Sequence, residues 1–255
     1  MTRLYFRSRK GLQQLVAFLE AVFEGIWLGV LDRKALQRID EHCYDGWSKY
    51  HDEAYNRQGL FAWEEEAVKT YFADCRRLLV AAAGGGREVL SLGKAGYDVD
   101  AFECHADLAE IANRLLREEG LSCEVEVVPR DECIGGTRSY DGLIAGWGAY
   151  MLIQGRDRRV AFLCSLHRRV PPRAPLLLSF YHRQPGPRRF KVIASVGNLL
   201  RWILRRRRLE LGDALAPNYV HYFTKEEIAF ELRQAGFALV FYNAEEYGHA
   251  VALRE

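Results

Sequence analysis

The spacing of apolar positions changes near residue 76, and the change divides the chain into two predicted segments. Before it, apolar side chains recur every three or four positions, which is typical of amphipathic helices. After it, short apolar runs alternate with helical patterns, as in a sheet covered by helices. The pattern predicts a helical cap over residues 1–75 and an α/β domain over residues 76–255.

Seven short apolar runs in the second segment predict strands. They lie at residues 78–83, 99–103, 124–128, 140–145, 176–181, 237–242 and 249–253. The last two runs follow one another without a helix, and strands joined by a short loop pair antiparallel. A capping box, Thr224 with Glu227, begins the helix that precedes them. We therefore expect a seven-stranded, mostly parallel sheet whose last strand is antiparallel.

Residues 11–30 are the most apolar stretch of the predicted cap. One helical face of this stretch carries Leu12, Leu15, Leu19, Val22, Phe23, Ile26, Trp27 and Val30. The run is interrupted by Gln13, Gln14, Glu20 and Glu24. A membrane-spanning helix needs about 20 nearly uninterrupted apolar residues. We expect an amphipathic helix whose apolar face packs on its own domain rather than in a membrane, and no signal peptide.

Charge adds one local feature. The chain of 255 residues has 36 Lys and Arg against 34 Asp and Glu, a formal net charge of +2. Nine basic residues and one acidic residue lie between Arg183 and Glu210. An apolar helical face there carries Ile193, Val196, Leu199, Leu200, Ile203 and Leu204, and another face carries Arg201, Arg205 and Arg208. We predict a basic helical insertion over residues 184–212.

Four roles are open to this insertion. We favour a lid whose apolar face closes a substrate pocket. Peripheral contact with an anionic membrane through residues 188–208 is the second. Nucleic-acid binding ranks below these, because few aromatic side chains are present to stack on bases. A packed surface helix with solvated arginines is the structural alternative.

The six cysteines indicate a reducing compartment. They form no CxxC pair, and no Cys/His cluster has zinc-ligand spacing. We therefore expect reduced thiols, a cytoplasmic protein and no structural metal.

The loop after the first predicted strand is suited to a nucleotide. Residues 80–88 read VAAAGGGRE, and the three glycines let the backbone turn tightly and approach a ligand. The following helix presents unpaired N–H groups at its N-terminus. Glu103, 17 residues beyond Gly86 and at the end of the next strand, can accept hydrogen bonds from both hydroxyls of a ribose. A GxGxxG dinucleotide motif fits poorly, because its third glycine falls on Val89 if the motif begins at Gly84 and on Arg87 if it begins at Ala82.

Residues 79–112 resemble class I S-adenosylmethionine-dependent methyltransferases, and the resemblance extends over about residues 45–255 apart from the insertion. The loop of that family reads acid-x-Gly-x-Gly-x-Gly. Gly84 and Gly86 match its last two glycines and Glu103 matches its ribose-binding acid, whereas Val80 replaces the loop acid and Ala82 the first glycine. The resemblance implies a Rossmann-like sheet with helices on both faces, S-adenosylmethionine as methyl donor, S-adenosylhomocysteine as product, and no metal.

The resemblance also implies which residues contact the cofactor at the carboxyl ends of the strands. They are Ala82, Ala83, Gly84, Gly86, Glu103, Cys104, Asp131, Glu132, Gly146, Trp147, Tyr50 and Tyr55. Asp131 and Glu132 are alternatives for the adenine amino group. Tyr50 and Tyr55 are alternatives for the methionine carboxylate, with Tyr44 as a third.

Substrate contacts are expected from Trp147, Tyr150, His182 and Tyr222. The candidate bases are His221, which we favour, His51 and His182, because imidazole titrates near neutrality. Residues 146–150 lack the Pro-Pro pair of nucleobase amine methyltransferases, which argues against a nucleic-acid substrate. Residues 182–183 provide no carboxylate, which argues against a catalytic metal.

We therefore expect O- or N-methylation of a small molecule by in-line transfer, with anionic acceptors among the candidates. The alternative is a non-catalytic module that binds S-adenosylmethionine or S-adenosylhomocysteine and associates with a membrane or partner through the basic helix.

Overall fold

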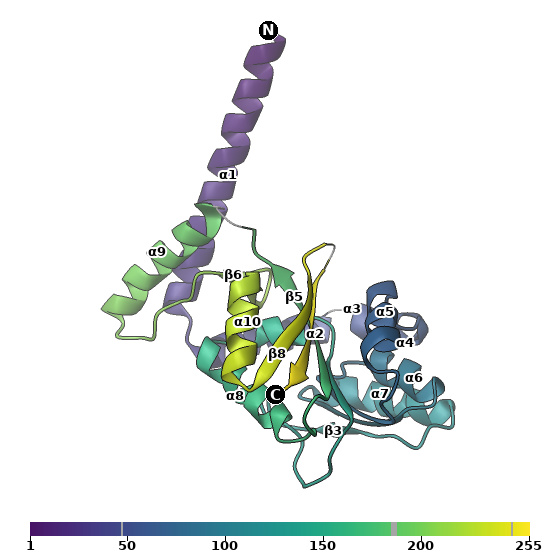
Figure 1. Cartoon of the computed structure of the whole chain (residues 1–255). Coiled ribbons are helices and arrows are strands. Elements are labelled where there is room, and N and C mark those ends of the chain that lie inside the picture. The colour runs from purple at the N-terminus through teal and green to yellow at the C-terminus, as the bar shows by residue number, and fades with distance from the viewer. Residues whose placement is uncertain (47, 185–187, 246) are drawn as a thin grey trace. The chain divides into compact units, whose positions relative to one another are not determined.

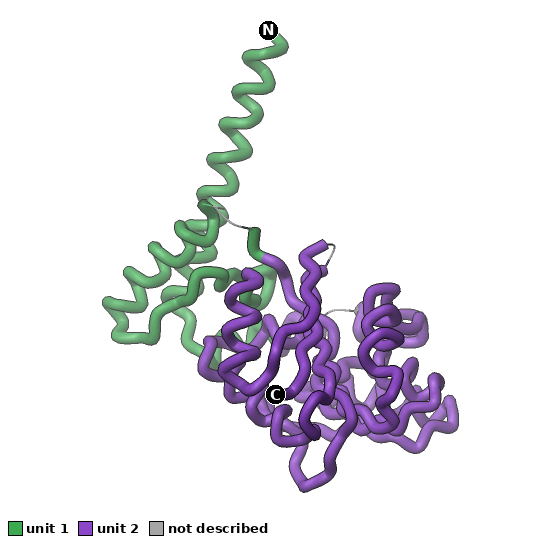
Figure 2. The backbone as a smooth tube through the Cα atoms, in the orientation of Figure 1, with its two compact units in different colours: residues 1–40, 183–222 green, residues 41–182, 223–255 purple. Residues whose placement is uncertain are grey.

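The computed structural model describes residues 1–46, 48–184, 188–245 and 247–255, which form two compact units (Figures 1 and 2). Unit 1 contains residues 1–40 and 183–222, and unit 2 contains residues 41–182 and 223–255. These units divide the chain differently from the predicted segments. Only residues 1–40 of the expected cap join the insertion in unit 1, and residues 41–75 belong to unit 2. Residues 185–187 of the predicted insertion lie outside the described residues.

Unit 2 is built on a sheet with the strand order β3-β2-β1-β4-β5-β9-β8 (Figure 1). The first five strands in this order run parallel, and β9 pairs antiparallel with both β5 and β8. The strands are β1 (Arg77–Ala81), β2 (Asp98–Glu103), β3 (Val125–Val127), β4 (Gly142–Ala145), β5 (Pro175–His182), β8 (Phe237–Asn243) and β9 (Gly248–Arg254). The predicted mostly parallel sheet with an antiparallel last strand is confirmed.

Helices flank this sheet. Those before β1 are α3 (Ser48–His51), α4 (Glu53–Arg57) and α5 (Ala62–Tyr71), after α2 (Arg33–Gly46), which begins in unit 1. Those between or after the strands are α6 (Arg87–Lys94), α7 (Ala106–Glu118), the 3-10 helix η1 (Ala149–Leu152), α8 (Arg156–His167) and α10 (Lys225–Gln234). The Thr224 capping box is present, since the Thr224 N–H donates to Glu227 Oε2 at 2.8 Å and Thr224 Oγ1 accepts from Glu227 N–H at 3.3 Å.

The register of the central strands explains why their sequences are apolar throughout. Leu78 and Val80 of β1 lie beside Val99 and Ala101 of β2, and all four are buried. A strand covered on both faces has no solvent side, so polar and apolar residues do not alternate. These side chains form one core with residues of α6 and α7, and the carboxyl ends of β1, β2 and β4 meet at one edge of the sheet.

Unit 1 consists of α1 (Thr2–Val30), the first part of α2, α9 (Arg188–Ile203) and the hairpin of β6 (Asp213–Leu215) and β7 (Tyr219–Phe223). Glycines bring α1 and α9 together. A Cβ on Gly25 would lie 2.9 Å from the Ile193 carbonyl oxygen, and one on Gly29 would lie 2.8 Å from Leu200 Cβ. Substitution at either position would push the helices apart, because backbone cannot yield as a flexible side chain can.

One expectation for these helices is wrong. The apolar face of residues 11–30 does not pack on its own domain: α1 meets α9 through its small residues, and most of that face is exposed. The apolar face predicted for the insertion packs only in part against α1, through Ile193, Val196 and Leu200. Its other members, Leu199, Ile203 and Leu204, are exposed, and the lid stays a prediction. Small residues occupy the contact because they permit the closest approach of two backbones.

Arg201 also differs from its predicted place on a solvated face. Its Nε donates to the Leu28 carbonyl at 2.9 Å, and a terminal nitrogen donates to the Leu31 carbonyl at 3.3 Å. These carbonyls end α1, where the helix dipole favours a positive charge. Glu24, one turn before Leu28 in α1, forms an ion pair with Arg189 at 2.9 Å.

Three helices of unit 2 are joined by a buried ion pair. Arg159 of α8 donates from Nε and a terminal nitrogen to Glu231 of α10, at 2.9 and 2.7 Å. The Tyr150 hydroxyl donates to the same carboxylate at 2.6 Å. All three side chains are fully buried, so the loss of Glu231 would leave the Arg159 charge without its carboxylate partner.

We expect Glu231→Ala to lower the free energy of unfolding by about 3–5 kcal/mol, because it strands the buried Arg159 guanidinium. Glu227→Ala on the same helix removes only half of a capping box and should cost about 1 kcal/mol. Urea denaturation followed by circular dichroism measures both. Equal effects of the two substitutions would contradict this role for Glu231.

Candidate functional site

The loop between β1 and α6 adopts backbone angles that only small residues tolerate well. Ala82 and Gly84 both have φ of 54°, and Gly86, which caps α6, has φ of 93°. Gly146, after β4, lies so close that a Cβ there would be 2.1 Å from the Ala82 carbonyl oxygen. The loops after β1 and β4 therefore touch through backbone, as required where a ligand is to lie on bare main chain.

Glu103, at the end of β2, organises this edge of the sheet. Its Oε2 accepts the Gly84 N–H at 2.7 Å, and its Oε1 accepts the N–H groups of Cys104 and His105 at 2.7 and 3.0 Å. A carboxylate offers about four lone-pair sites. Within the described residues three are used, so one site on Oε2 remains for a ribose hydroxyl. A second hydroxyl would have to displace a backbone donor.

The segment of α3 and α4 covers the glycine loop. The Asn56 side-chain amide donates to the Tyr50 carbonyl at 3.0 Å, and Asn56 is buried. A Cβ on Gly85 would lie 2.4 Å from Asn56 Nδ2 and 2.7 Å from the Tyr50 carbonyl oxygen. The middle glycine of the loop thus allows the α3–α4 segment to pack closely on the loop. A ligand that lies there would be shielded from water.

A buried charge cluster fastens the start of α5 to α6. Arg87 donates to both oxygens of Glu64, at 2.6 and 2.8 Å, and to Glu88 at 2.6 Å. The guanidinium also lies 3.9 Å from the centre of the Phe61 ring. Burial alone would lower the pKa of Arg87, but the two carboxylates raise it. Burial raises the pKa of Glu64, which the hydrogen bond from Arg87 opposes. Two carboxylates on one guanidinium give the cluster a preference for further positive charge.

Aromatic rings lie where the α3–α4 segment approaches the loop after β4. Lys49 Nζ lies 4.5 Å from the ring centre of Tyr55 and 5.2 Å from that of Trp147. The rings of Tyr50 and Tyr55 meet edge to face at 5.9 Å. Burial raises the pKa of the Tyr55 hydroxyl to about 12 and raises that of Tyr50 further, so both remain neutral. This cluster presents ring faces to a cation, and Lys49 supplies that cation here.

The loops after β2 and β3 provide the remaining wall. Val128 N–H donates to the Glu103 carbonyl at 2.9 Å, so the loop after β3 begins beside Glu103. Arg130 lies 3.0 Å from His105 Nε2, and the Tyr44 ring lies 4.8 Å from the His105 ring. Asp131 has a φ of 66°, and its carboxylate lies 3.5 Å from Arg158. Glu132 is exposed, so of these two candidates Asp131 is the one held in place by a partner.

The structure brings most of the predicted cofactor residues together in unit 2. The loops of Ala82–Gly86, Glu103–Cys104 and Gly146–Trp147 share one sheet edge, with Tyr50 and Tyr55 in the segment above it. Sequence reasoning missed Arg87, Glu64, Glu88, Asn56 and Lys49. No local pattern marks them, because each gains its role from a partner distant in sequence.

The predicted substrate and base residues are more dispersed. Tyr150 is fully buried against Glu231 and Phe223, so it serves the core and cannot reach a substrate. His182 Nδ1 lies 2.7 Å from the Tyr242 hydroxyl, and His51 Nε2 lies 3.1 Å from the Tyr44 carbonyl. Tyr222 belongs to unit 1, where its ring packs on Phe190.

His221, the favoured base, is a core residue of unit 1. It is fully buried, and its Nδ1 lies 2.7 Å from Asp213 Oδ1, which also accepts the Tyr219 hydroxyl at 2.8 Å. Burial raises the pKa of Asp213, but the hydrogen bonds from His221, the Glu210 N–H and Tyr219, together with the charge of His221, outweigh it, and the pKa is lowered. A fully buried imidazole cannot exchange a proton with a substrate, so the prediction of His221 as catalytic base is wrong.

We expect Gly85→Ala to lift the α3–α4 segment from the loop, because the added Cβ meets the Tyr50 backbone. Limited proteolysis should then cleave residues 41–60 about tenfold faster, as expected for loss of a local closing contact of roughly 1–2 kcal/mol. Gly84→Ala is the matched control: its Cβ meets nothing within 4 Å, and only the positive φ of 54° is strained. Cleavage of this segment at the same rate in both variants would contradict the closing contact.

Neither a protein-family model nor a curated protein sequence matches the chain. Solved structures do match in fold. A SAM-dependent methyltransferase from Methanosarcina mazei has a TM-score of 0.60 and 19% identity, covering 77% of this chain and 98% of its own. The Burkholderia thailandensis 1,6-didemethyltoxoflavin-N1-methyltransferase, with bound S-adenosylhomocysteine, has a TM-score of 0.58 and 20% identity, covering 86% and 89%.

A third match is the SAM-bound amino pentose methyltransferase of Micromonospora echinaspora, which is involved in calicheamicin biosynthesis. Its TM-score is 0.56 and its identity 15%, and the alignment covers 86% of this chain and 96% of that one. At these identities the likeness establishes architecture. The chain has the Rossmann-like fold of class I S-adenosylmethionine-dependent methyltransferases.

Proposed function

We propose that the chain binds S-adenosylmethionine and transfers its methyl group to a small molecule. The observation that carries the proposal is the placement of Glu103 beside the Gly84 N–H, next to Gly85, which the α3–α4 segment covers. This edge offers a ribose acceptor, bare backbone and neighbouring rings in one place. Three matching structures were solved with S-adenosylmethionine or S-adenosylhomocysteine bound, and this supports the same ligand here.

Charge and ring geometry suit the two positive groups of this cofactor, its sulfonium and its ammonium. The Arg87, Glu64 and Glu88 cluster prefers additional positive charge, and Glu88 Oε1 also accepts the Trp147 N–H at 3.1 Å. Glu88 is therefore our candidate to take the role of the family's loop acid, whose position Val80 occupies in this chain. The ring of Trp147 is our candidate to face the sulfonium in the place where Lys49 lies.

In-line methyl transfer asks the protein mainly to hold the acceptor near the methyl carbon and to exclude water. Trp147, packed by Phe61 and Tyr247 at ring distances of 6.2 and 5.1 Å, would form one wall for the acceptor. His51 and His182 remain the candidate bases in unit 2. We propose O- or N-methylation, with an anionic acceptor among the candidates, and a cytoplasmic location, in keeping with six cysteines that form no disulfide within the described residues.

The direct test is isothermal titration with S-adenosylmethionine, S-adenosylhomocysteine and NAD. Both adenosyl ligands should bind and NAD should not. Glu103→Ala should weaken adenosyl binding about 10- to 100-fold, the loss expected for a hydrogen bond to a charged acceptor. Glu126→Ala, an exposed acid on β3, is the control and should leave binding unchanged.

Glu103→Gln separates ligand contact from folding, because it retains the shape of the side chain. An unchanged free energy of unfolding together with weakened adenosyl binding would support a role of Glu103 in the site. If the unaltered protein binds neither adenosyl ligand, the proposal fails. If it binds both but transfers no methyl group to any of a panel of small acceptors, the non-catalytic binding module is correct instead.

Trp147→Ala tests the placement of the sulfonium. A cation–π contact of about 1 kcal/mol predicts roughly fivefold weaker binding of S-adenosylmethionine. S-adenosylhomocysteine has no sulfonium charge and should lose much less. Trp147→Phe keeps a ring face and should restore most of the difference. Equal losses for the two ligands would place Trp147 away from the sulfonium.

A further inference from the structure

The two units carry opposite charge. Unit 1 has 16 basic and six acidic residues in residues 1–40 and 183–222, a net charge of +10. Unit 2 has 20 basic and 28 acidic residues, a net charge of −8. A near-neutral chain thus contains one strongly cationic unit of 80 residues. Such a unit repels a copy of itself and attracts an anionic partner.

The same unit exposes a long apolar surface on α1. We call this surface the α1 stripe; it comprises Tyr5, Leu12, Leu15, Val16, Leu19, Phe23, Ile26, Trp27 and Val30. Helical periodicity places it on the side opposite Ala21, Gly25 and Leu28, which are buried. Leu12, Leu19 and Phe23 are 61%, 56% and 62% exposed. Monomeric soluble proteins rarely expose contiguous apolar patches larger than a few hundred Å².

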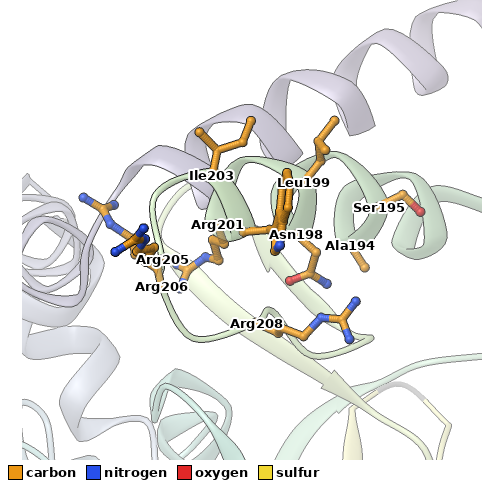
Figure 3. A pocket seen from close by; sticks show the side chains of 10 residues that line it. Ala194, Ser195, Asn198, Leu199, Arg201, Ile203, Arg205, Arg206 and Arg208 are labelled. Atoms are coloured by element: carbon orange, nitrogen blue, oxygen red, sulfur yellow. The ribbon is translucent and has the colours of Figure 1, made fainter.

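Basic residues occupy the other sides of α1 near its N-terminus. Arg9 borders the stripe, Arg3, Arg7 and Lys10 lie on the opposite side, and the helix has no acidic residue before Glu20. On α9, a hollow of about 1230 Å³ combines Leu199, Trp202 and Ile203 with Arg205, Arg206 and Arg208 (Figure 3). Trp202 is 76% exposed. The hollow lies on the side of α9 opposite Ile193, Gly197 and Leu200, which meet α1, so it faces away from the stripe. On α1 itself, an apolar side and a cationic side match the two layers of a membrane interface, acyl chains and headgroup phosphates.

We propose that unit 1 binds the surface of an anionic phospholipid bilayer, with α1 lying in the interface and its stripe facing the acyl chains. The basic N-terminal turns of α1 would contact headgroup phosphates, and the α9 hollow would face the solvent. The proposal moves the membrane contact from residues 188–208 to α1, and it does not depend on cofactor binding.

A helix in the interface fits better than one that spans the membrane. Within the described ranges, α1 is the one helix long and apolar enough to cross, and only 22% of its most apolar window is buried. Its opposite side is polar, however, with Lys10, Gln13 and Gln14, and its last turns are held by Arg189 and Arg201 of α9. A spanning helix would place this polar side in hydrocarbon. A second copy fits less well, because it would bring two units of +10 together.

The test is flotation of the full chain with vesicles of phosphatidylcholine alone or mixed with phosphatidylglycerol. The protein should float with the mixed vesicles, and binding should weaken as salt is raised. Leu19→Asp with Phe23→Asp should reduce flotation about tenfold or more, because it puts charge into the stripe. Gln13→Asp with Gln14→Asp adds the same charge to the polar side and should reduce flotation much less.

Further variants keep the proposal falsifiable. Arg3→Gln with Arg7→Gln should weaken flotation while leaving the stripe intact, whereas Arg205→Gln with Arg208→Gln on α9 should weaken it much less. Circular dichroism and cofactor titration should show that each variant is folded. No flotation of the unaltered protein overturns the proposal, as do equal losses for the two aspartate pairs. Resistance to alkaline carbonate extraction would show a spanning helix instead. A dimer in solution that the stripe variant dissociates, without flotation, would identify a second copy as the partner.

Discussion

The Glu103 carboxylate is the constraint on which the candidate site depends. Buried backbone N–H groups need acceptors, and the turns after β1 and β2 leave three of them at one point. Glu103 accepts all three, and thereby joins the ends of two neighbouring strands. The glycines of the loop follow from this closeness, because Ala82 and Gly146 also touch through backbone. An edge shaped in this way exposes main chain to a ligand.

Buried charge acts beside apolar packing to hold α5 and the residues before it on this edge, since Ala67, Val68 and Phe72 also belong to the core. Arg87 enters α6 directly after the glycines, and a buried guanidinium requires carboxylate partners. Glu64 provides one at the start of α5, and the residues before α5 are drawn over the loop with it. Because Glu88 adds a second carboxylate, the same cluster that fastens the cap also favours a cationic ligand. The same three side chains thus attach the segment and favour positive charge beside it.

Charge separates the two units in a way that suits two tasks. The acidic unit 2 contains the glycine loop and the proposed cofactor site, and the basic unit 1 contains the apolar stripe and the arginine hollow. An enzyme concentrated at an anionic surface would meet amphipathic or membrane-derived acceptors at high local concentration. The proposed small-molecule substrate and the proposed membrane contact are therefore compatible, although neither requires the other.

The sequence by itself determined the architecture of unit 2 and the main chain of its site. Seven apolar runs, the glycines at 84–86 and the acid at 103 are local signals, because strand burial, positive φ and a strand-end carboxylate each leave a mark within a few residues. It did not determine that Tyr150 and His221 are buried, or that Arg87 pairs with Glu64, since these depend on partners far away in the chain. The tertiary structure also decided which side of α1 meets α9. Hydrophobicity pointed to the leucine face, but two helix backbones approach most closely through glycine, and the apolar face remained exposed.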